Sequence, residues 1–127
     1  MRHYFFELLA CPACKSVELD LHPIVKERRE VNVNVEKVRC KRFCSLYRKP
    51  AEQVPTSECA NCVHWDIVEG VIVCKSCGRW YPIVEGIPVM LVDKYRNPRE
   101  DEAFIRRNLE RIPQDVLRLM RYPRVLS

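Results

Sequence analysis

The sequence predicts an α+β fold with a small antiparallel sheet, an inserted cysteine-containing subdomain and C-terminal helices. Two observations carry this prediction. Two C-x-x-C pairs, Cys11–Cys14 and Cys74–Cys77, stand on either side of a long intervening segment, and short apolar runs adjoin both pairs. Each pair directs two thiolates at one point, and together they supply the four ligands of a tetrahedral Zn²⁺. The predicted core is therefore a zinc ribbon.

Apolar periodicity places the strands of the sheet on both sides of the insert. The apolar residues between Phe5 and Leu9 predict a first short strand or turn before the first cysteine pair. Four further segments predict strands: residues 17–21, 71–73, 80–84 and 87–92. We expect Glu69–Gly70 to form the turn before the second of these strands, and Glu85–Gly86 the turn between the last two.

The metal is expected to be structural. A site closed by four thiolates has no open position for water or a substrate. The cluster would carry about two negative charges, which Lys15, Lys75 and Arg79 beside the cysteines can offset. Gly78, directly after Cys77, suits the left-handed backbone of such a turn.

Residues 22–66 predict a basic inserted subdomain between the two halves of the core. From Lys26 to Lys49, nine Lys or Arg stand against three Glu, a net charge of +6, whereas the whole chain carries +5. Alternating valines at 31–35 predict one more strand, and residues 40–49 predict a basic helical stretch. The charge indicates either a solvated face or a contact with the phosphates of tRNA.

The insert contains a C-x3-C pair and a C-x2-C pair, formed by Cys40, Cys44, Cys59 and Cys62. In a cytosolic chain such pairs favour metal binding, so these are candidate ligands of a second Zn²⁺, with disulfides or free thiols as alternatives. A metal would stabilise an insert that has little core of its own. The spacing also permits Cys59/Cys62 to pair with Cys74/Cys77, and His64 to replace one cysteine of the second site.

Two helices are expected after the sheet. Asn97 and Pro98 suit the N-cap and the first helical position, Glu100 completes a capping box, and Pro113 ends this helix. A second short helix is expected from Gln114 to Met120. We expect both helices to cap the sheet, and the alternative is that part of their apolar face meets a partner.

The chain is thus divided into a core of residues 1–21 and 67–93, the insert 22–66, and a C-terminal helical segment 94–127. No apolar stretch approaches the roughly 20 residues of a membrane span. The short apolar run before the first cysteine pair is interrupted by Glu7, unlike the core of a signal peptide. We expect a cytoplasmic protein with no membrane partner.

Two segments resemble a known family: L-L-A-C-P-A-C-K at 8–15 and C-K-S-C-G-R-W-Y-P-I-V-E-G-I-P-V-M-L at 74–91. They are similar to the small zinc-ribbon activator subunits of methyltransferases, whose bacterial relatives are shorter and lack the insert. The resemblance implies a non-catalytic partner of S-adenosylmethionine-dependent enzymes that methylate tRNA, ribosomal RNA or the glutamine of a release factor. It also implies a partner-binding strand at 87–91 and the zinc ligands Cys11, Cys14, Cys74 and Cys77.

The run from Ile87 to Leu91 predicts the same surface from its chemistry. All of its residues are apolar, yet Pro88 lacks a backbone donor and belongs at a sheet edge. An exposed apolar edge is stabilised by pairing with a strand of another protein. The candidate partner-binding residues are Trp80, Tyr81, Ile83, Ile87, Pro88, Val89, Met90 and Leu91. The alternative is that the C-terminal helices cover this edge.

The sequence shows no catalytic constellation. Three histidines are scattered along the chain, and three glycines form no loop that could hold a phosphate or S-adenosylmethionine. We therefore expect a chain that is not itself an enzyme and has no small-molecule substrate. The resemblance implies that it forms a heterodimer with a methyltransferase, whose native state it would stabilise. The alternatives are a nucleic-acid-binding zinc ribbon, a rubredoxin-like iron protein for electron transfer, and a metal chaperone.

Overall fold

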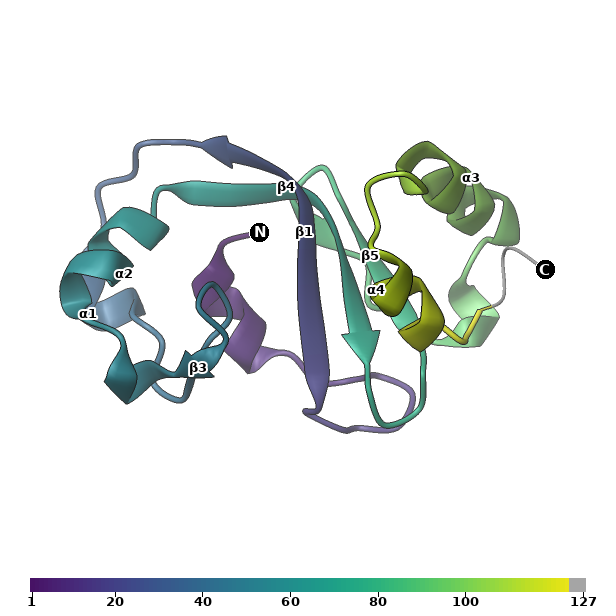
Figure 1. The fold of residues 1–127 in the computed structure, drawn as a ribbon, viewed down its shortest axis with the longest axis horizontal. Helices are drawn as coiled ribbons and strands as arrows, with labels where there is room; N and C mark the ends of the chain where they lie inside the picture. The colour runs from purple at the N-terminus through teal and green to yellow at the C-terminus, as the bar shows by residue number, and fades with distance from the viewer. Residues whose placement is uncertain (124–127) are drawn as a thin grey trace.

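The computed structural model describes residues 1–123 and shows a four-stranded sheet with further elements on both sides (Figure 1). The strands are antiparallel in the order β1-β4-β5-β6. Their bounds are β1 Leu19–Arg28, β4 Trp65–Cys74, β5 Trp80–Val84 and β6 Ile87–Pro88. The predicted α+β class is confirmed. No helix within residues 1–123 is long and apolar enough to cross a membrane.

β4 lies between β1 and β5, and its second half is buried on both faces. Ile72 and Cys74 belong to a cluster formed with the N-terminal residues, whereas Val71 and Val73 pack with the C-terminal helices. A strand covered on both faces has no solvated face, so its sequence shows continuous apolar residues instead of alternation.

Gly70 lies inside β4, where it pairs with Pro23 on one side and Ile83 on the other. The prediction of a turn at Glu69–Gly70 is therefore wrong. A Cβ atom at Gly70 would lie 3.0 Å from the carbonyl oxygen of His22. The glycine permits the close approach of β1 and does not mark the end of a strand.

β1 is longer than the predicted strand 17–21 and extends into the predicted insert. It begins at Leu19, which is buried together with Leu21, whereas Val17 is 72% exposed. The strand continues to Arg28 because β4 pairs with it along its whole length. The alternation of apolar and polar residues identified the buried face of β1, but pairing with β4 determines the length of the strand.

β5 and β6 form the predicted hairpin. Glu85 and Gly86 both have positive φ, 51° and 79°, as a two-residue type I′ turn requires. β6 ends at Pro88, where the sequence predicts a strand to residue 92. Beyond it, the N–H of Val89 donates to a carbonyl of β5 at 2.8 Å, so the chain follows β5 for a further residue without a regular ladder.

The insert consists of short elements beside an N-terminal 3₁₀ helix. They are η1 His3–Leu8, α1 Val35–Val38, β2 Phe43–Cys44, β3 Lys49–Pro50, η2 Ala51–Gln53 and α2 Thr56–Cys62. η1 stands where the sequence predicts a first strand or turn. The predicted strand 31–35 is wrong because the β1–β4 ladder has already ended at Arg28. The predicted helical stretch 40–49 is also wrong, because this segment contains β2 and the turn to β3.

Glu7 attaches the insert to η1. Its carboxylate accepts hydrogen bonds from the backbone N–H groups of Lys41, Arg42 and Phe43, at 2.9, 2.9 and 3.3 Å. Burial raises the pKa of Glu7, but these bonds outweigh it, so the pKa lies below its ordinary value. The ionised carboxylate is therefore the form that stabilises this attachment.

The C-terminal helices pack on one face of the sheet, as expected (Figure 1). Their bounds are α3 Pro98–Asn108 and α4 Gln114–Leu119. The side chain of Asn97 accepts a hydrogen bond from the N–H of Arg99 and caps α3 as predicted. Phe104 of α3 and Val116 of α4 are buried against the sheet. Residues 124–127 of the predicted C-terminal segment lie outside the described residues.

Arg96 joins the segment after β6 to the sheet and to α3. It follows a short 3₁₀ helix, η3 Asp93–Tyr95. Its guanidinium pairs with Asp101 at 3.0 Å, with the two side chains only 5% and 9% exposed. The same group donates to the carbonyl of Trp80 and lies 4.6 Å from the centre of that indole ring. The ion pair is thus shielded from solvent and held against the core.

Replacement of Arg96 by Met is expected to lower the free energy of unfolding by about 3–5 kcal/mol, because Asp101 then remains buried without its partner. Denaturant unfolding followed by circular dichroism measures this loss. The control is Arg106→Met, which breaks an exposed pair with Glu102 on α3 worth about 0.3–0.5 kcal/mol. Similar small effects of both substitutions would contradict the role of Arg96.

Glu7 is expected to make stability depend on pH. Because its pKa is lowered by folding, its contribution is complete above the ordinary value of 4.5 and is lost as the pH falls through the folded value. Glu7→Gln should therefore be less stable than the natural chain at pH 7, by a margin that shrinks toward pH 4. Thermal unfolding measures this margin, with Glu52→Gln, an exposed residue of the insert, as control. A margin that does not change with pH would count against the role of Glu7.

Candidate functional site

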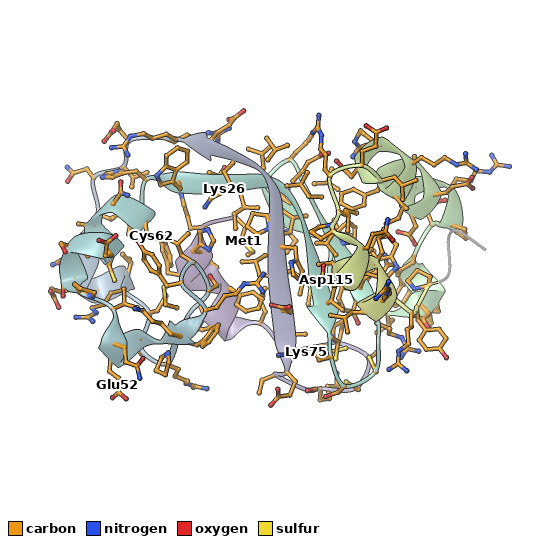
Figure 2. The ribbon with its side chains drawn as sticks, in the orientation of Figure 1. Met1, Lys26, Glu52, Cys62, Lys75 and Asp115 are labelled. Carbon is orange, nitrogen blue, oxygen red and sulfur yellow. The ribbon has the colours of Figure 1, made fainter. Side chains whose placement is uncertain are left out.

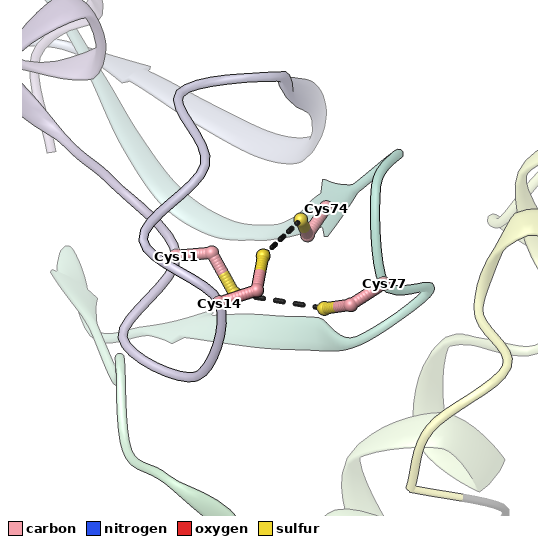
Figure 3. A group of neighbouring side chains, drawn as sticks. All are labelled: Cys11, Cys14, Cys74 and Cys77. Carbon is pink, nitrogen blue, oxygen red and sulfur yellow. Dashed lines mark hydrogen bonds between the residues drawn. The ribbon is translucent and has the colours of Figure 1, made fainter.

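The fold brings Cys11, Cys14, Cys74 and Cys77 together (Figure 3). Their sulfur atoms lie within 4.8 Å of one another. The Sγ atoms of Cys11 and Cys77 are 3.7 Å apart, and those of Cys14 and Cys74 are 3.6 Å apart. A tetrahedral ion with metal–sulfur bonds of about 2.3 Å requires sulfurs about 3.8 Å apart. The four thiols therefore fit a tetrahedral, thiophilic ion.

Both cysteine pairs adopt the same backbone turn. The N–H of Lys15 donates to the carbonyl of Cys11 at 2.8 Å, and the N–H of Gly78 donates to the carbonyl of Cys74 at 2.9 Å. Lys15 and Gly78 both have left-handed φ, 68° and 79°. The prediction for Gly78 is confirmed, whereas the equivalent position of Lys15 gives no signal in the sequence because it is not a glycine.

Hydrogen bonds at the cluster act on the first cysteine of each pair. Burial raises the pKa of Cys11, but the Tyr81 hydroxyl, 3.1 Å from its sulfur, and the N–H groups of Cys14 and Ala13 reverse this and lower it. Burial raises the pKa of Cys74 above its ordinary value. The cluster thus contains one thiol that is predisposed to ionise and one that holds its proton in the absence of a cation.

Arg79 is the predicted cation that contacts the cluster. Hydrogen bonds to Asp93 and to the sulfur of Cys77 raise the pKa of its guanidinium, and Arg79 pairs with Asp93 at 2.9 Å. The ammonium of Lys15 instead donates to the carbonyl of Pro12 at 3.2 Å. Arg79 therefore offsets part of the negative charge that the cluster carries when its thiols are ionised.

The second predicted set does not converge in the same way. Among residues 1–123, Cys11, Cys14, Cys74 and Cys77 are the one group of possible ligands whose atoms all lie within 4.8 Å of one another. The sulfur atoms of the second set do not meet this criterion. All eight cysteines are free thiols. The thiols of the second set line one cavity, with contributions from Cys40, Cys44, Cys59 and Cys62. Because Cys74/Cys77 cluster with Cys11/Cys14, the alternative pairing with Cys59/Cys62 is wrong.

His64 does not line this cavity, whereas His3 does. The Nδ1 atom of His64 accepts a hydrogen bond from the N–H of Val31 at 3.2 Å, so this residue is engaged elsewhere. His3 is buried, and burial, with the charges of Lys26 and the N-terminus, lowers its pKa to about 4. No local motif indicates a role for His3, because the residues around it in the cavity come from the distant insert.

The predicted partner strand lies at an uncovered edge of the sheet. Ile87 is 63% exposed and Leu91 is 39% exposed. The N–H groups of Met90, Leu91 and Val92 form no backbone hydrogen bond with any other described residue. Since α3 and α4 pack on a face of the sheet, the alternative that these helices cover the edge is wrong.

An open cavity of about 370 Å³ adjoins this edge. Val89 and Leu91 line it on one side, and residues of α3, among them Phe104 and Arg107, line it on the other. Tyr95, which is 64% exposed, stands at the same cavity. The edge therefore offers backbone donors beside a recess that is lined by both apolar and charged residues.

Three of the candidate partner-binding residues do not belong to this surface. Trp80, Tyr81 and Ile83 are at most 1% exposed. Their side chains fill the two faces of the sheet, because β5 has β4 and β6 on its sides and packed layers above and below. The prediction is corrected to Ile87, Pro88, Val89, Met90 and Leu91.

Together, the antiparallel sheet and the cluster of four thiols define a small α+β protein of the zinc-ribbon type. A family model described as "Trm112p-like protein" matches residues 2–86. The chain therefore belongs to the Trm112p-like family, in agreement with the resemblance of its cysteine motifs.

Two known proteins are similar to this chain. A UPF0434 protein of Methylobacillus flagellatus is 44% identical over 46 residues, which are 35% of this chain and 77% of the relative. A chain from the solved E. cuniculi Mtq2–Trm112 complex matches with a TM-score of 0.51 and 25% identity, over 73% of this chain and 96% of that chain. That complex is described as responsible for the methylation of the translation termination factor eRF1.

Cys74→Ser is expected to abolish tight binding of Zn²⁺ at the cluster and to unfold the core, because a structural Zn²⁺ site contributes on the order of 10 kcal/mol. Metal content and circular dichroism of the purified chain measure both effects. Ser76→Ala, at an exposed position of the same turn, is the matched control. A folded Cys74→Ser chain with an unchanged unfolding midpoint would show that the metal is not structural.

Proposed function

We propose that this chain is the non-catalytic subunit of a heterodimer with an S-adenosylmethionine-dependent methyltransferase, which it stabilises and thereby activates. The observation that carries the proposal is the exposed apolar edge at 87–91, next to N–H groups at 90–92 that form no backbone hydrogen bond with the described residues. Family membership and the match to a chain of a methylating complex agree with this function.

The four-thiol cluster would hold one structural Zn²⁺. Its donor set is soft and its sulfur spacing fits a tetrahedron, which favours Zn²⁺ over ions that prefer oxygen ligands. Four protein ligands leave no position for water or substrate, so the metal would supply stability to the ribbon and no Lewis-acid chemistry. The proposal therefore assigns the methyl transfer to the partner chain.

The edge would bind its partner by strand addition. In an extended strand alternate N–H groups point to the same side, and that of Val89 points to β5. The N–H groups of Met90 and Val92 would therefore donate to carbonyls of an edge strand in the methyltransferase and extend its sheet. Ile87 and Leu91 would become buried, and each buried aliphatic side chain contributes about 1.5–3 kcal/mol. The cavity beside Leu91 and Tyr95 would receive an apolar side chain of the partner.

Activation would follow from linkage. A subunit that binds only the native enzyme stabilises it by about 2.7 kcal/mol when its concentration is 100 times the dissociation constant. The enzyme's cofactor site then remains folded for a larger fraction of the time. No residue of this chain needs to reach the reacting atoms.

We also propose that the methylated substrate is tRNA or another translation component in the cytoplasm, and that the basic insert contacts its phosphates. Lys37, Lys41 and Arg42 are exposed and form no ion pair with the described residues. Arg28, Arg29 and Arg48 have carboxylate partners. The free cations favour a salt-dependent, sequence-independent contact.

The first experiment is co-purification of the tagged chain from its own cells, followed by reconstitution of each captured methyltransferase with the purified chain. We expect the enzyme to be more stable and more active in the pair than alone. RNA binding by the isolated chain, with no methyltransferase captured and an affinity that falls steeply with salt, would favour the nucleic-acid-binding alternative. A red, redox-active protein containing iron would favour the electron carrier.

The double variant Ile87→Asp/Leu91→Asp is expected to bind the methyltransferase about 100-fold more weakly, because two carboxylates would have to be buried at the interface. Calorimetry or surface plasmon resonance with the reconstituted enzyme measures this loss. Val17→Asp is the matched control, since Val17 is 72% exposed and precedes β1 at the opposite edge. Unchanged affinity of a folded double variant would place the interface elsewhere.

A further inference from the structure

The insert contains a small cavity between η1 and the short helices. Its volume is about 20 Å³, which is room for one ion or one water molecule. Cys40 follows α1, Cys44 ends β2, and Cys59 and Cys62 belong to α2, and all four side chains line this cavity. Four thiols from three separate segments are thus among the residues that line one cavity with room for a single ion.

Cys44 lies in a turn of the same kind as those of the first cluster. The N–H of Arg48 donates to the carbonyl of Cys44 at 2.7 Å, and Arg48 has a left-handed φ of 56°. The N–H of Tyr47 contacts the sulfur of Cys44 at 3.5 Å. Lys15 and Gly78 hold the corresponding positions after Cys11 and Cys74. The backbone therefore presents Cys44 as it presents the leading cysteine of each pair in the first cluster.

The turn at Cys44 differs from the other two in one respect. Three residues after Cys44 stands Tyr47, where the first cluster has Cys14 and Cys77. Cys40, four residues before Cys44, takes the place of that second thiol and lines the same cavity. The order of ligands in the sequence is changed, but the number of thiols around the space is the same.

His3 provides a second, independent indication of a ligand. The residue is 2% exposed and its side chain lines the cavity, and its Nε2 atom has no hydrogen-bond partner among residues 1–123. Its other ring nitrogen, Nδ1, lies 2.9 Å from the hydroxyl of Ser45. A buried polar atom without a partner is unfavourable unless a group in the adjacent space pairs with it. A thiolate bound to a cation in the cavity would be such a group.

We propose that Cys40, Cys44, Cys59 and Cys62 bind a second Zn²⁺ in this cavity, with His3 donating a hydrogen bond from Nε2 to one of the thiolates. This requires the tautomer with its proton on Nε2, in which the Ser45 hydroxyl turns from the carbonyl oxygen of His3 and donates to Nδ1. Each thiol gives its proton to solvent as its sulfur binds the ion, and the sulfurs move inward to bond lengths of about 2.3 Å. His3 acts as a positioning residue and not as a ligand.

The second site would stabilise an insert that has few other means of folding. α1 and α2 span only Val35–Val38 and Thr56–Cys62, and helices of this length are not stable on their own. The two sites lie at opposite ends of β4: Cys62 precedes the strand, and Lys75 follows its last residue, Cys74 (Figure 2). The ten residues of β4 lie between the two sites, so a substitution in one site leaves the ligands of the other unchanged.

The test is the Zn²⁺ content of the purified full chain, determined by elemental mass spectrometry. We expect about two Zn²⁺ per natural chain and about one in Cys59→Ser/Cys62→Ser. Ser57→Ala, on the same helix, is the matched control and should retain about two. After Co²⁺ substitution, the visible absorption of tetrahedral cobalt–thiolate is expected to fall by about half in the double variant.

In the His3→Ala variant, one of the two ions is expected to be lost to a chelator about 10–100-fold more readily than in the natural chain. His3→Gln keeps an N–H donor and is expected to restore part of the lost metal affinity. About one Zn²⁺ per natural chain in excess Zn²⁺, with the insert thiols reactive in the folded state, would overturn the proposal. Disulfides between the insert cysteines in the freshly purified chain would also overturn it. The Zn²⁺ content of the natural chain tests the second site even where a variant fails to fold. This measurement does not involve the methyltransferase, so its outcome is independent of the proposed function.

Discussion

The sulfur cluster joins two turns that lie 60 residues apart in the sequence, and the arrangement of the sheet depends on this junction. Cys11 and Cys14 precede β1, Cys74 ends β4, and Cys77 lies before β5. One cluster therefore fixes the ends of three strands. A small domain buries too little apolar surface to fold with a large margin, so a closed metal site supplies free energy that the core alone does not.

The two edges of the sheet differ in how they are protected. β1 carries charged residues, Pro23 and irregular register between Pro23 and Lys26, which are features that prevent pairing with other chains. β6 has none of these charges, and the chain that follows it leaves its N–H groups at 90–92 without partners. Pro88 protects only the first part of this edge. In the proposed heterodimer, this asymmetry would direct strand addition to one side of the molecule and favour a specific pair over aggregation.

Features encoded by adjacent residues could be predicted from the sequence, and features set by tertiary pairing could not. The cysteine turns, the Glu85–Gly86 hairpin and the Asn97 cap each depend on a few neighbouring residues. The valines at 31–35 alternate as in a strand, but no strand of the described chain pairs with them. Trp80 is apolar and adjoins the partner strand, yet only the packing of α3 shows that it is buried. His3 enters its cavity through contacts with a distant segment, which no local motif reports.

Metal binding and partner binding are connected through β5. The hydroxyl of Tyr81 lies 3.1 Å from the sulfur of Cys11, and β6 is attached to the sheet only through β5. Loss of the cluster would therefore act on the exposed edge through β5, although no cysteine of the cluster belongs to that edge. A partner that recognises the ordered edge therefore binds the metal-loaded chain more tightly than the metal-free chain. By linkage, the partner raises the affinity of the cluster for its metal by the same factor, so that each binding event stabilises the other without direct contact.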